Sequence, residues 1–183
     1  MKSRILIYGV DGFMGALASR AAMRGRIAHV AAGRNIAGVA QHAAALAKEA
    51  GTTIAEPRTF TLGDKARIAA QLDDVGVVVN CMPLDGTDML ALLDACIDTE
   101  THYIDVTSER AHVAALAAHD EVAKRAKTMV MAGAGFDYAA VDAVAERLAQ
   151  ILRGARAVTI AVKRGPPTLA EAERLVAALG AEG

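Results

Sequence analysis

Three glycines near the start of the chain have the spacing of a phosphate-binding turn. Gly9, Gly12 and Gly15 recur every third residue, directly after the apolar run at 5–8. The first would permit a tight turn, the second would let the backbone approach a pyrophosphate, and the third would let the next helix pack closely. Free amides at the helix N-terminus would face the phosphate oxygens. The pattern predicts a dinucleotide site rather than an empty turn, with these residues: Gly9, Asp11, Gly12, Phe13, Met14 and Gly15.

The end of the second predicted strand lacks the acidic residue of NAD-specific sites. Such sites place Asp or Glu about 20 residues beyond the glycine turn, where its carboxylate bonds the ribose 2′-hydroxyl. This chain has Gly33-Arg34-Asn35 instead. Arg34 could bind a 2′-phosphate and stack its guanidinium on the adenine, whereas the alternative interpretation is a solvated loop charge. Together with the glycine turn, Arg34 and Asn35 predict NADP(H) as the cofactor.

Polar and turn residues follow the third and fourth predicted strands. Asp64 could approach the adenine, although the N-cap of the next helix is the favoured interpretation. The segment Asn80-Cys81-Met82-Pro83 ends the fourth strand, at the sheet edge where ligands bind in such folds. Its backbone would run under the nicotinamide-side ribose, but Pro83 stops the strand, so a purely structural turn competes evenly. The predicted cofactor site includes Asp64, Asn80, Cys81, Met82 and Pro83.

Candidate proton donors gather around the end of the fifth predicted strand. Alternation turns Tyr103 and Asp105 to the same side, and a carboxylate buried in a strand is costly unless it is hydrogen-bonded. Glu109 could be a cleft residue or a first-turn helix carboxylate. Each tyrosine of the chain lacks a lysine four residues later, so the Tyr-x-x-x-Lys pair of short-chain alcohol dehydrogenases is missing. The sequence therefore leaves the catalytic residues unassigned.

A second glycine-containing segment, Gly133-Ala134-Gly135-Phe136-Asp137-Tyr138, ends the sixth predicted strand. Its glycines indicate close approach of the backbone to a ligand or to a neighbouring strand. Asp142 is expected on the first turn of the next helix. The five histidines are scattered through the chain, so the sequence predicts no metal site.

Short apolar runs alternate with alanine-rich amphipathic stretches along most of the chain. The predicted strands are 5–8, 29–32, 59–62, 75–80, 103–106 and 129–132, and the predicted helices are 14–24, 36–50, 65–72, 88–98, 113–127 and 141–152. These repeated units predict an α/β fold with a doubly wound, mainly parallel Rossmann sheet. A further strand at 157–162 and helix at 169–179 are too little for a second domain. We expect a Rossmann domain over 1–154 and the start or remnant of a substrate or dimerisation domain over 155–183.

The composition indicates a soluble α/β protein with small core side chains. Apolar residues form 54% of the chain, but aromatic residues only 3%. A net charge of -1 gives no electrostatic reason to expect nucleic acid or an anionic membrane as a partner. No apolar stretch approaches the roughly 20 residues that span a bilayer. Because Cys81 and Cys96 form no CxxC or metal spacing, we expect reduced thiols in a cytoplasmic protein.

Several stretches together resemble the saccharopine dehydrogenase-like family, in its NADP-binding half. The resemblance rests on the glycine turn, on Ala32-Gly33-Arg34-Asn35 and on Val78-Val79-Asn80-Cys81-Met82-Pro83. It is most specific in Cys96 with His102-Tyr103-Ile104-Asp105-Val106-Thr107-Ser108-Glu109, and in Gly133-Ala134-Gly135-Phe136-Asp137-Tyr138 with Asp142. It covers about residues 3–165. The family includes saccharopine reductases and dehydrogenases and trans-acting enoyl reductases.

The chain departs from the family pattern in two places. Ala139-Ala140 stands where the family often has a proline, so the local turn is expected to differ. Residues 155–183 stand where family members continue into a substrate domain, which contributes the other wall of the active site.

Two functional hypotheses follow from the motifs and the resemblance. The first is an NADP(H)-dependent oxidoreductase, or its cofactor-binding domain, that reduces a carbonyl, imine or enoyl group of a small-molecule substrate with hydride from the cofactor. The second is a non-catalytic NADP-binding module or redox sensor that lacks a full substrate domain. A homodimer is plausible because the strand at 157–162 would leave an unpaired edge unless it joins the sheet or a second copy.

Overall fold

The computed structural model describes residues 2–51, 53, 55–84, 86–106, 109–161, 165–166, 172–173 and 176. The chain divides into two compact units, residues 1–142 and 143–183. The domain boundary predicted after residue 154 lies within the second unit. The helix predicted at 169–179 lies largely outside the described residues.

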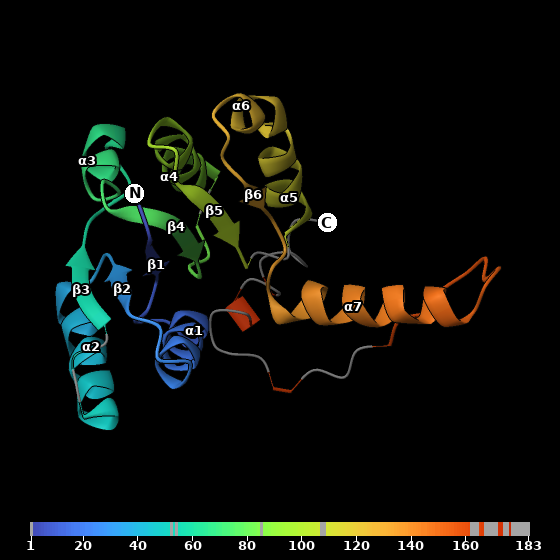
Figure 1. Cartoon of the computed structure of the whole chain (residues 1–183), viewed down its shortest axis with the longest axis horizontal. Coiled ribbons are helices and arrows are strands. Elements are labelled where there is room, and N and C mark those ends of the chain that lie inside the picture. The colour runs from blue at the N-terminus through green and yellow to red at the C-terminus, as the bar shows by residue number, and fades with distance from the viewer. Residues whose placement is uncertain are drawn as a thin grey trace. The chain divides into compact units, whose positions relative to one another are not determined.

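The first unit is built on a parallel sheet whose strands, in the described part of the chain, run in the order β3-β2-β1-β4-β5-β6 (Figure 1). These strands are β1 (Arg4–Tyr8), β2 (His29–Gly33), β3 (Ala55–Thr59), β4 (Val75–Asn80), β5 (His102–Asp105) and β6 (Val130–Met131). Tyr8 at the end of β1 pairs with Ala32 of β2 on one side and with Asn80 of β4 on the other. Because the strand order reverses at β1, a ligand crevice is expected beside the end of that strand. The predicted doubly wound fold is confirmed.

Helices cover both faces of the sheet, as Figure 1 shows. On one face lie α1 (Phe13–Arg24) and α2 (Ile36–Ala50), and on the other lie α3 (Lys65–Ala70), α4 (Gly86–Asp98), α5 (Arg110–Ala117) and α6 (Asp120–Arg125). Alternate residues of each strand feed the two apolar layers, so that Leu6 and Tyr8 pack in the layer of α4 whereas Ile7 packs in the other. The sheet is therefore buried on both faces along β1, as a parallel sheet requires.

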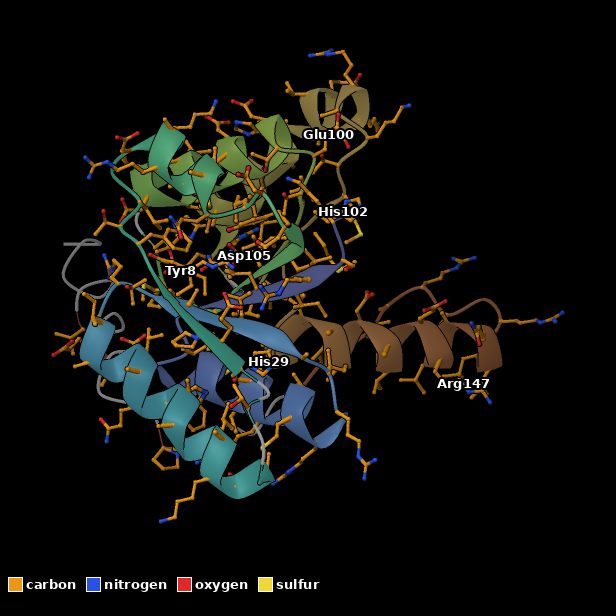
Figure 2. The ribbon with its side chains drawn as sticks, turned by 60° about the vertical axis from the view of Figure 1, so that its left-hand side comes forward. Tyr8, His29, Glu100, His102, Asp105 and Arg147 are labelled. Carbon is orange, nitrogen blue, oxygen red and sulfur yellow. The ribbon has the colours of Figure 1, made fainter. Side chains whose placement is uncertain are left out.

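One polar contact lies inside the layer of α1 and α2. The Ser19 hydroxyl on α1 is 2.6 Å from Nε2 of His29 on β2, and Nδ1 of the same ring is 3.1 Å from the Ile27 carbonyl oxygen. Both side chains are buried. In Figure 2, His29 lies toward α1 and α2, whereas Tyr8 and Asp105 lie toward α3 and α4. The imidazole thus has a hydrogen-bonding partner at each nitrogen, which a buried polar ring needs.

The third strand was predicted at 59–62, but it occupies Ala55–Thr59. Glu56, Pro57 and Arg58 gave this segment the composition of a loop. An edge strand tolerates both proline and charge, because one of its sides forms no ladder. β3 pairs with β2 alone, and its charged side chains bind Arg4 and Asp74 on neighbouring elements.

Three further predictions need correction near the end of the chain. The helix predicted at 113–127 is two helices, α5 and α6, with His119 as the N-cap of the second. α7 (Phe136–Ile151) begins five residues before the predicted start at 141, so Asp142 lies in its second turn. The strand predicted at 157–162 is absent from the described residues 157–161, which have no regular secondary structure. Val158 and Ile160 are exposed there, so their apolar alternation does not mark burial.

The described part of the chain contains no helix that is both long and apolar enough to cross a membrane. Cys81 and Cys96 are both buried and form no disulfide.

Candidate functional site

The glycine turn joins β1 to α1 in a conformation that two of its glycines make feasible. Gly9 has φ of 89°, in the left-handed region where a side chain is strained. A Cβ atom on Gly15 would overlap the Gly9 carbonyl oxygen and lie 2.8 Å from Val10 Cα. The turn is anchored to β2, since the amides of Gly9 and Val10 both donate to the Ala32 carbonyl, at 2.7 and 3.2 Å. The structural roles predicted for Gly9 and Gly15 are thereby confirmed.

Gly12 is less constrained by the fold than the other two glycines. Its φ is -95°, which any residue adopts. A Cβ atom there would lie 3.3 Å from the Gly9 carbonyl oxygen, which is a tight contact but not the overlap found at Gly15. Gly12 is also the N-cap of α1, so a side chain there would stand at the helix end that a phosphate would approach. Packing therefore explains the absence of a side chain less fully at Gly12 than at Gly9 and Gly15.

The N-terminus of α1 offers backbone donors to such a ligand. Gly12 is its N-cap and has no side-chain capping bond, and the first turn contains no acidic residue. The first amides of a helix have no partner within the helix, and the aligned peptide dipoles favour an anion there. Phe13 and Met14 are exposed at this end, with Phe13 at 66%. The glycine turn and the first turn of α1 therefore form a cradle that fits a pyrophosphate.

The segment after β4 packs against this cradle. The Cys81 amide donates to the Tyr8 carbonyl at 2.9 Å, and a Cβ atom on Gly9 would lie 3.0 Å from Met82 Cβ. Asn80 shapes the segment, because its Oδ1 accepts a hydrogen bond from the Met82 amide at 3.1 Å. The structure thus brings Cys81 and Met82 beside the glycine turn, with Pro83 following directly in the chain.

A buried polar network supports the same edge of the sheet. The Tyr103 hydroxyl donates to Oδ2 of Asp105 at 2.5 Å, and Nδ2 of Asn80 donates to the same oxygen at 3.0 Å. All three residues are buried. The sequence predicted that Tyr103 and Asp105 share a side and that Asp105 needs hydrogen bonds, and both predictions are confirmed. It missed Asn80 as their partner, since the pairing of β4 with β5 brings Asn80 level with Asp105.

This network makes Tyr103 a poor proton donor. Burial, reinforced by the neighbouring Asp105 carboxylate, raises the pKa of Tyr103 far above its usual value. Glu109, the third candidate, is the N-cap residue of α5 and lies 3.7 Å from the His112 imidazole. Thr107 and Ser108 between them fall outside the described residues.

Arg34 directly follows β2, at the carboxyl end of the strand. Its side chain is half exposed, and its guanidinium lies 3.6 Å from the carboxylate of Asp88 on the first turn of α4. The next residue, Asn35, is the N-cap of α2, and its side chain accepts a hydrogen bond from the Gly38 amide at 3.2 Å. Asp88 was not predicted, because its approach to Arg34 depends on how α4 packs.

An open hollow of about 410 Å³ adjoins Arg34 and is lined by Ile36, Phe60, Thr61 and Arg67 as well. The hollow combines apolar and cationic groups, as an adenosine with a phosphate requires. Asp64 lies before α3, where its carboxylate accepts hydrogen bonds from the amides of Ala66 and Arg67, at 3.0 and 3.3 Å. The favoured interpretation of Asp64 as an N-cap is confirmed. Phe60, Thr61 and Arg67 were not among the predicted site residues.

A second, mostly apolar hollow of about 360 Å³ lies between α1 and the ends of β4 and β5. Cys81, Ile104 and Gly135 are among its lining residues. Burial raises the pKa of Cys81 to about 12. Gly135 lies close to the residue that follows β5, since a Cβ atom there would lie 2.6 Å from the Val106 carbonyl oxygen. The sequence left two explanations for these glycines, approach to a ligand or to a neighbouring strand. Approach to the backbone at the end of β5 explains Gly135. Gly133 has φ of 68°, a left-handed conformation that favours glycine.

Among the described residues no group of three or more histidine, cysteine or acidic side chains is arranged to hold a metal ion.

Comparison with known proteins agrees with this geometry. Residues 5–134 match the family model described as the saccharopine dehydrogenase NADP binding domain. A comparison with curated protein sequences finds no match.

Solved structures show the same fold at low sequence identity. Apo saccharopine dehydrogenase (L-Glu forming) from Saccharomyces cerevisiae is 22% identical with a TM-score of 0.61, over 78% of this chain and 31% of that one. A short-chain type dehydrogenase/reductase from Mycobacterium ulcerans is 11% identical with a TM-score of 0.57, over 82% and 76% of the two chains. The leucoanthocyanidin reductase–NADPH complex from Vitis vinifera is 15% identical with a TM-score of 0.51, over 71% and 48%. The chain thus spans about a third of the length of the yeast enzyme.

Proposed function

Because the chain belongs to the saccharopine dehydrogenase family through its NADP-binding domain, we propose that it holds the cofactor of an NADP(H)-dependent oxidoreductase. The proposed reaction reduces a carbonyl, imine or enoyl group of a small-molecule substrate. Bound NADPH would supply the hydride. The protein would bind the cofactor, orient it and keep water away from its reactive end.

The observation that carries the proposal is the open cradle between Gly12 and the uncapped start of α1. The backbone there presents donors that no side chain uses. We assign the pyrophosphate to this cradle, the 2′-phosphate to Arg34, and the nicotinamide side to the segment Asn80-Cys81-Met82-Pro83. Met82 packs against Gly9, so the two turns hold each other in place. This arrangement supports positioning of the cofactor at the end of β1.

The state of the candidate acids favours an alternative, a cofactor-binding module without catalysis of its own. Tyr103 and Asp105 bind each other inside the sheet and are almost inaccessible, at 0% and 2% exposure. Neither can touch a substrate in this arrangement. In this alternative the described residues bind NADPH, and a proton donor from elsewhere is needed for turnover.

Two measurements on the full chain separate these functions. Quenching or enhancement of NADPH fluorescence gives the binding affinity, and loss of NADPH absorbance in the presence of imine, carbonyl and enoyl compounds gives turnover. Binding with turnover would support the oxidoreductase. Binding without turnover on all three classes would favour the module, and absence of NADPH binding would overturn both.

A further inference from the structure

The carboxylate of Asp11 lies against the end of β2, although Asp11 belongs to the glycine turn. A Cβ atom added to Gly33 would be 3.0 Å from Oδ1 of Asp11. A Cβ atom added to Gly38, in the first turns of α2, would be 3.0 Å from Asp11 Cβ. The Asp11 side chain therefore fills the space that side chains at 33 and 38 would otherwise take.

That space has a defined role in dinucleotide-binding folds. An NAD-specific domain projects an acidic side chain from the end of β2, and this carboxylate accepts a hydrogen bond from the ribose 2′-hydroxyl. Here Gly33 ends β2 and contributes no side chain, but Asp11 places a carboxylate oxygen beside the position where one would begin. The sequence showed no acid at the strand end, whereas the structure supplies one from the glycine turn.

We propose that Asp11 sets the nucleotide preference of this site, by accepting a hydrogen bond from the adenosine ribose and opposing a 2′-phosphate. The proposal rests on the proposed cofactor binding. Arg34, the residue after Gly33, would attract a 2′-phosphate. Asp11 and Arg34 therefore have opposite effects on the affinity for that phosphate. The site then accepts NADH as well as NADPH, with a narrow difference in affinity.

The surroundings of Arg34 strengthen this argument. Its guanidinium already lies 3.6 Å from the Asp88 carboxylate, so a 2′-phosphate must share Arg34 with an existing anion. Arg67, in the same hollow, lies 3.4 Å from Asp64. Each cation near the proposed phosphate position therefore has a carboxylate beside it, and Asp11 adds a further negative charge at Gly33.

The test compares NADPH and NADH dissociation constants of the wild type, Asp11→Asn, Asp11→Ala and Arg34→Ala. Asp11→Asn removes the charge but keeps an acceptor oxygen, so NADPH affinity should rise about tenfold while NADH affinity changes little. Asp11→Ala should raise NADPH affinity similarly but also weaken NADH binding, by about threefold or more, because the acceptor is lost. Arg34→Ala should have the opposite effect on NADPH. Glu121→Gln on α6 removes the same charge from a distant exposed side chain and serves as the control.

The outcomes separate this proposal from the proposed function. If the wild type binds neither nucleotide, the proposed function fails and Asp11 has no role in preference. If it binds both and the Asp11 variants leave the ratio of the two dissociation constants unchanged, only the role of Asp11 is overturned. A wild type that prefers NADPH over NADH by more than about 100-fold would also overturn it, and this last measurement does not depend on whether a variant folds.

Discussion

Gly15 lies directly against Gly9, so that a Cβ atom on Gly15 would overlap the Gly9 carbonyl oxygen. The neighbouring atoms are backbone and cannot turn aside as a flexible side chain would. α1 approaches the end of β1 this closely because residue 15 has no side chain, whereas Gly9 is needed for its φ of 89° and its contact with Met82. The requirement comes from the protein itself, and it holds whether or not a nucleotide is bound.

The first prediction separates this structural requirement from ligand binding. Gly15→Ala should lower the free energy of unfolding by about 1–3 kcal/mol, because it overpacks backbone against backbone. Gly12→Ala should change the free energy of unfolding by less than about 1 kcal/mol but weaken NADPH binding at least about tenfold. Urea unfolding and NADPH titration measure the two effects.

The control for both glycine variants is Gly165→Ala. Among the described residues, no atom lies within 4 Å of a Cβ atom at Gly165, so this variant should match the wild type in both measurements. A Gly12→Ala protein that binds NADPH normally would contradict the assignment of the pyrophosphate to the cradle.

A second prediction concerns the reactivity of the two cysteines. Burial raises the pKa of Cys81 to about 12, with Asp105 adding to the effect, and burial also raises the pKa of Cys96. Since the thiolate is the reactive form, iodoacetamide at pH 8 should label neither cysteine in the folded protein and both after denaturation. Mass spectrometry of the labelled chain gives the result. Rapid labelling of Cys81 in the folded state would show that the hollow beside it admits solvent.

A third prediction follows from the charge network that joins β1, β3 and the turn before β4. Asp74 binds Arg4 at 2.8 Å and Arg58 at 2.9 Å, and Glu56 binds the same two guanidinium groups at 2.6 and 3.0 Å. Hydrogen bonds from Arg58, and to a smaller extent from Arg4, hold the pKa of Asp74 well below its usual value. The pKa of Glu56 is also lowered, mainly by the hydrogen bond from Arg4 and to a smaller extent by that from Arg58.

The sign of the resulting pH dependence is fixed by these directions. A carboxyl whose pKa is lower in the folded state contributes stability above its unfolded pKa of about 4, and this is lost as pH falls through the folded pKa. Both carboxylates are partly exposed, at 43% and 48%, so solvent screening limits the contribution to about 1 kcal/mol for each pair.

The variant that tests the network is Asp74→Asn. It should destabilise the protein at pH 7 by about 1–2 kcal/mol and make the loss of stability below pH 5 less steep. Urea midpoints between pH 3 and 7 measure both. Asp120→Asn, which removes an exposed ion pair with Lys124 on α6, should show neither change. Parallel loss of stability in the wild type and in Asp74→Asn would contradict the prediction.

The sequence was informative about local features and less so about side chains that meet across elements. The alternation of apolar runs and amphipathic stretches predicted the sheet, because strands buried on both faces are continuous apolar runs. The position of β3 was not predicted, because Glu56 and Arg58 belong to a charge network between elements that a local sequence pattern cannot show. The approach of Asp11 to Gly33 was not predicted either, because it also joins residues that are distant in the sequence. The sequence shows no acid at the end of β2, but Asp11, earlier in the chain, places a carboxylate oxygen 3.0 Å from where a Gly33 side chain would begin.

The last prediction concerns the hydrogen bonds of Tyr103. Tyr103→Phe removes a donor to the buried Asp105 carboxylate, and hydrogen bonds to charged groups are worth about 1.5–3 kcal/mol. Tyr8→Phe is a matched comparison, because the Tyr8 hydroxyl donates at 3.0 Å to the neutral Phe60 carbonyl, so this variant should cost only about 0.5–1.5 kcal/mol. Urea unfolding of the two variants gives the difference. Equal costs would mean that the remaining interactions of Asp105 satisfy its carboxylate without Tyr103, and that Tyr103 is not needed to hold the segment beside the glycine turn.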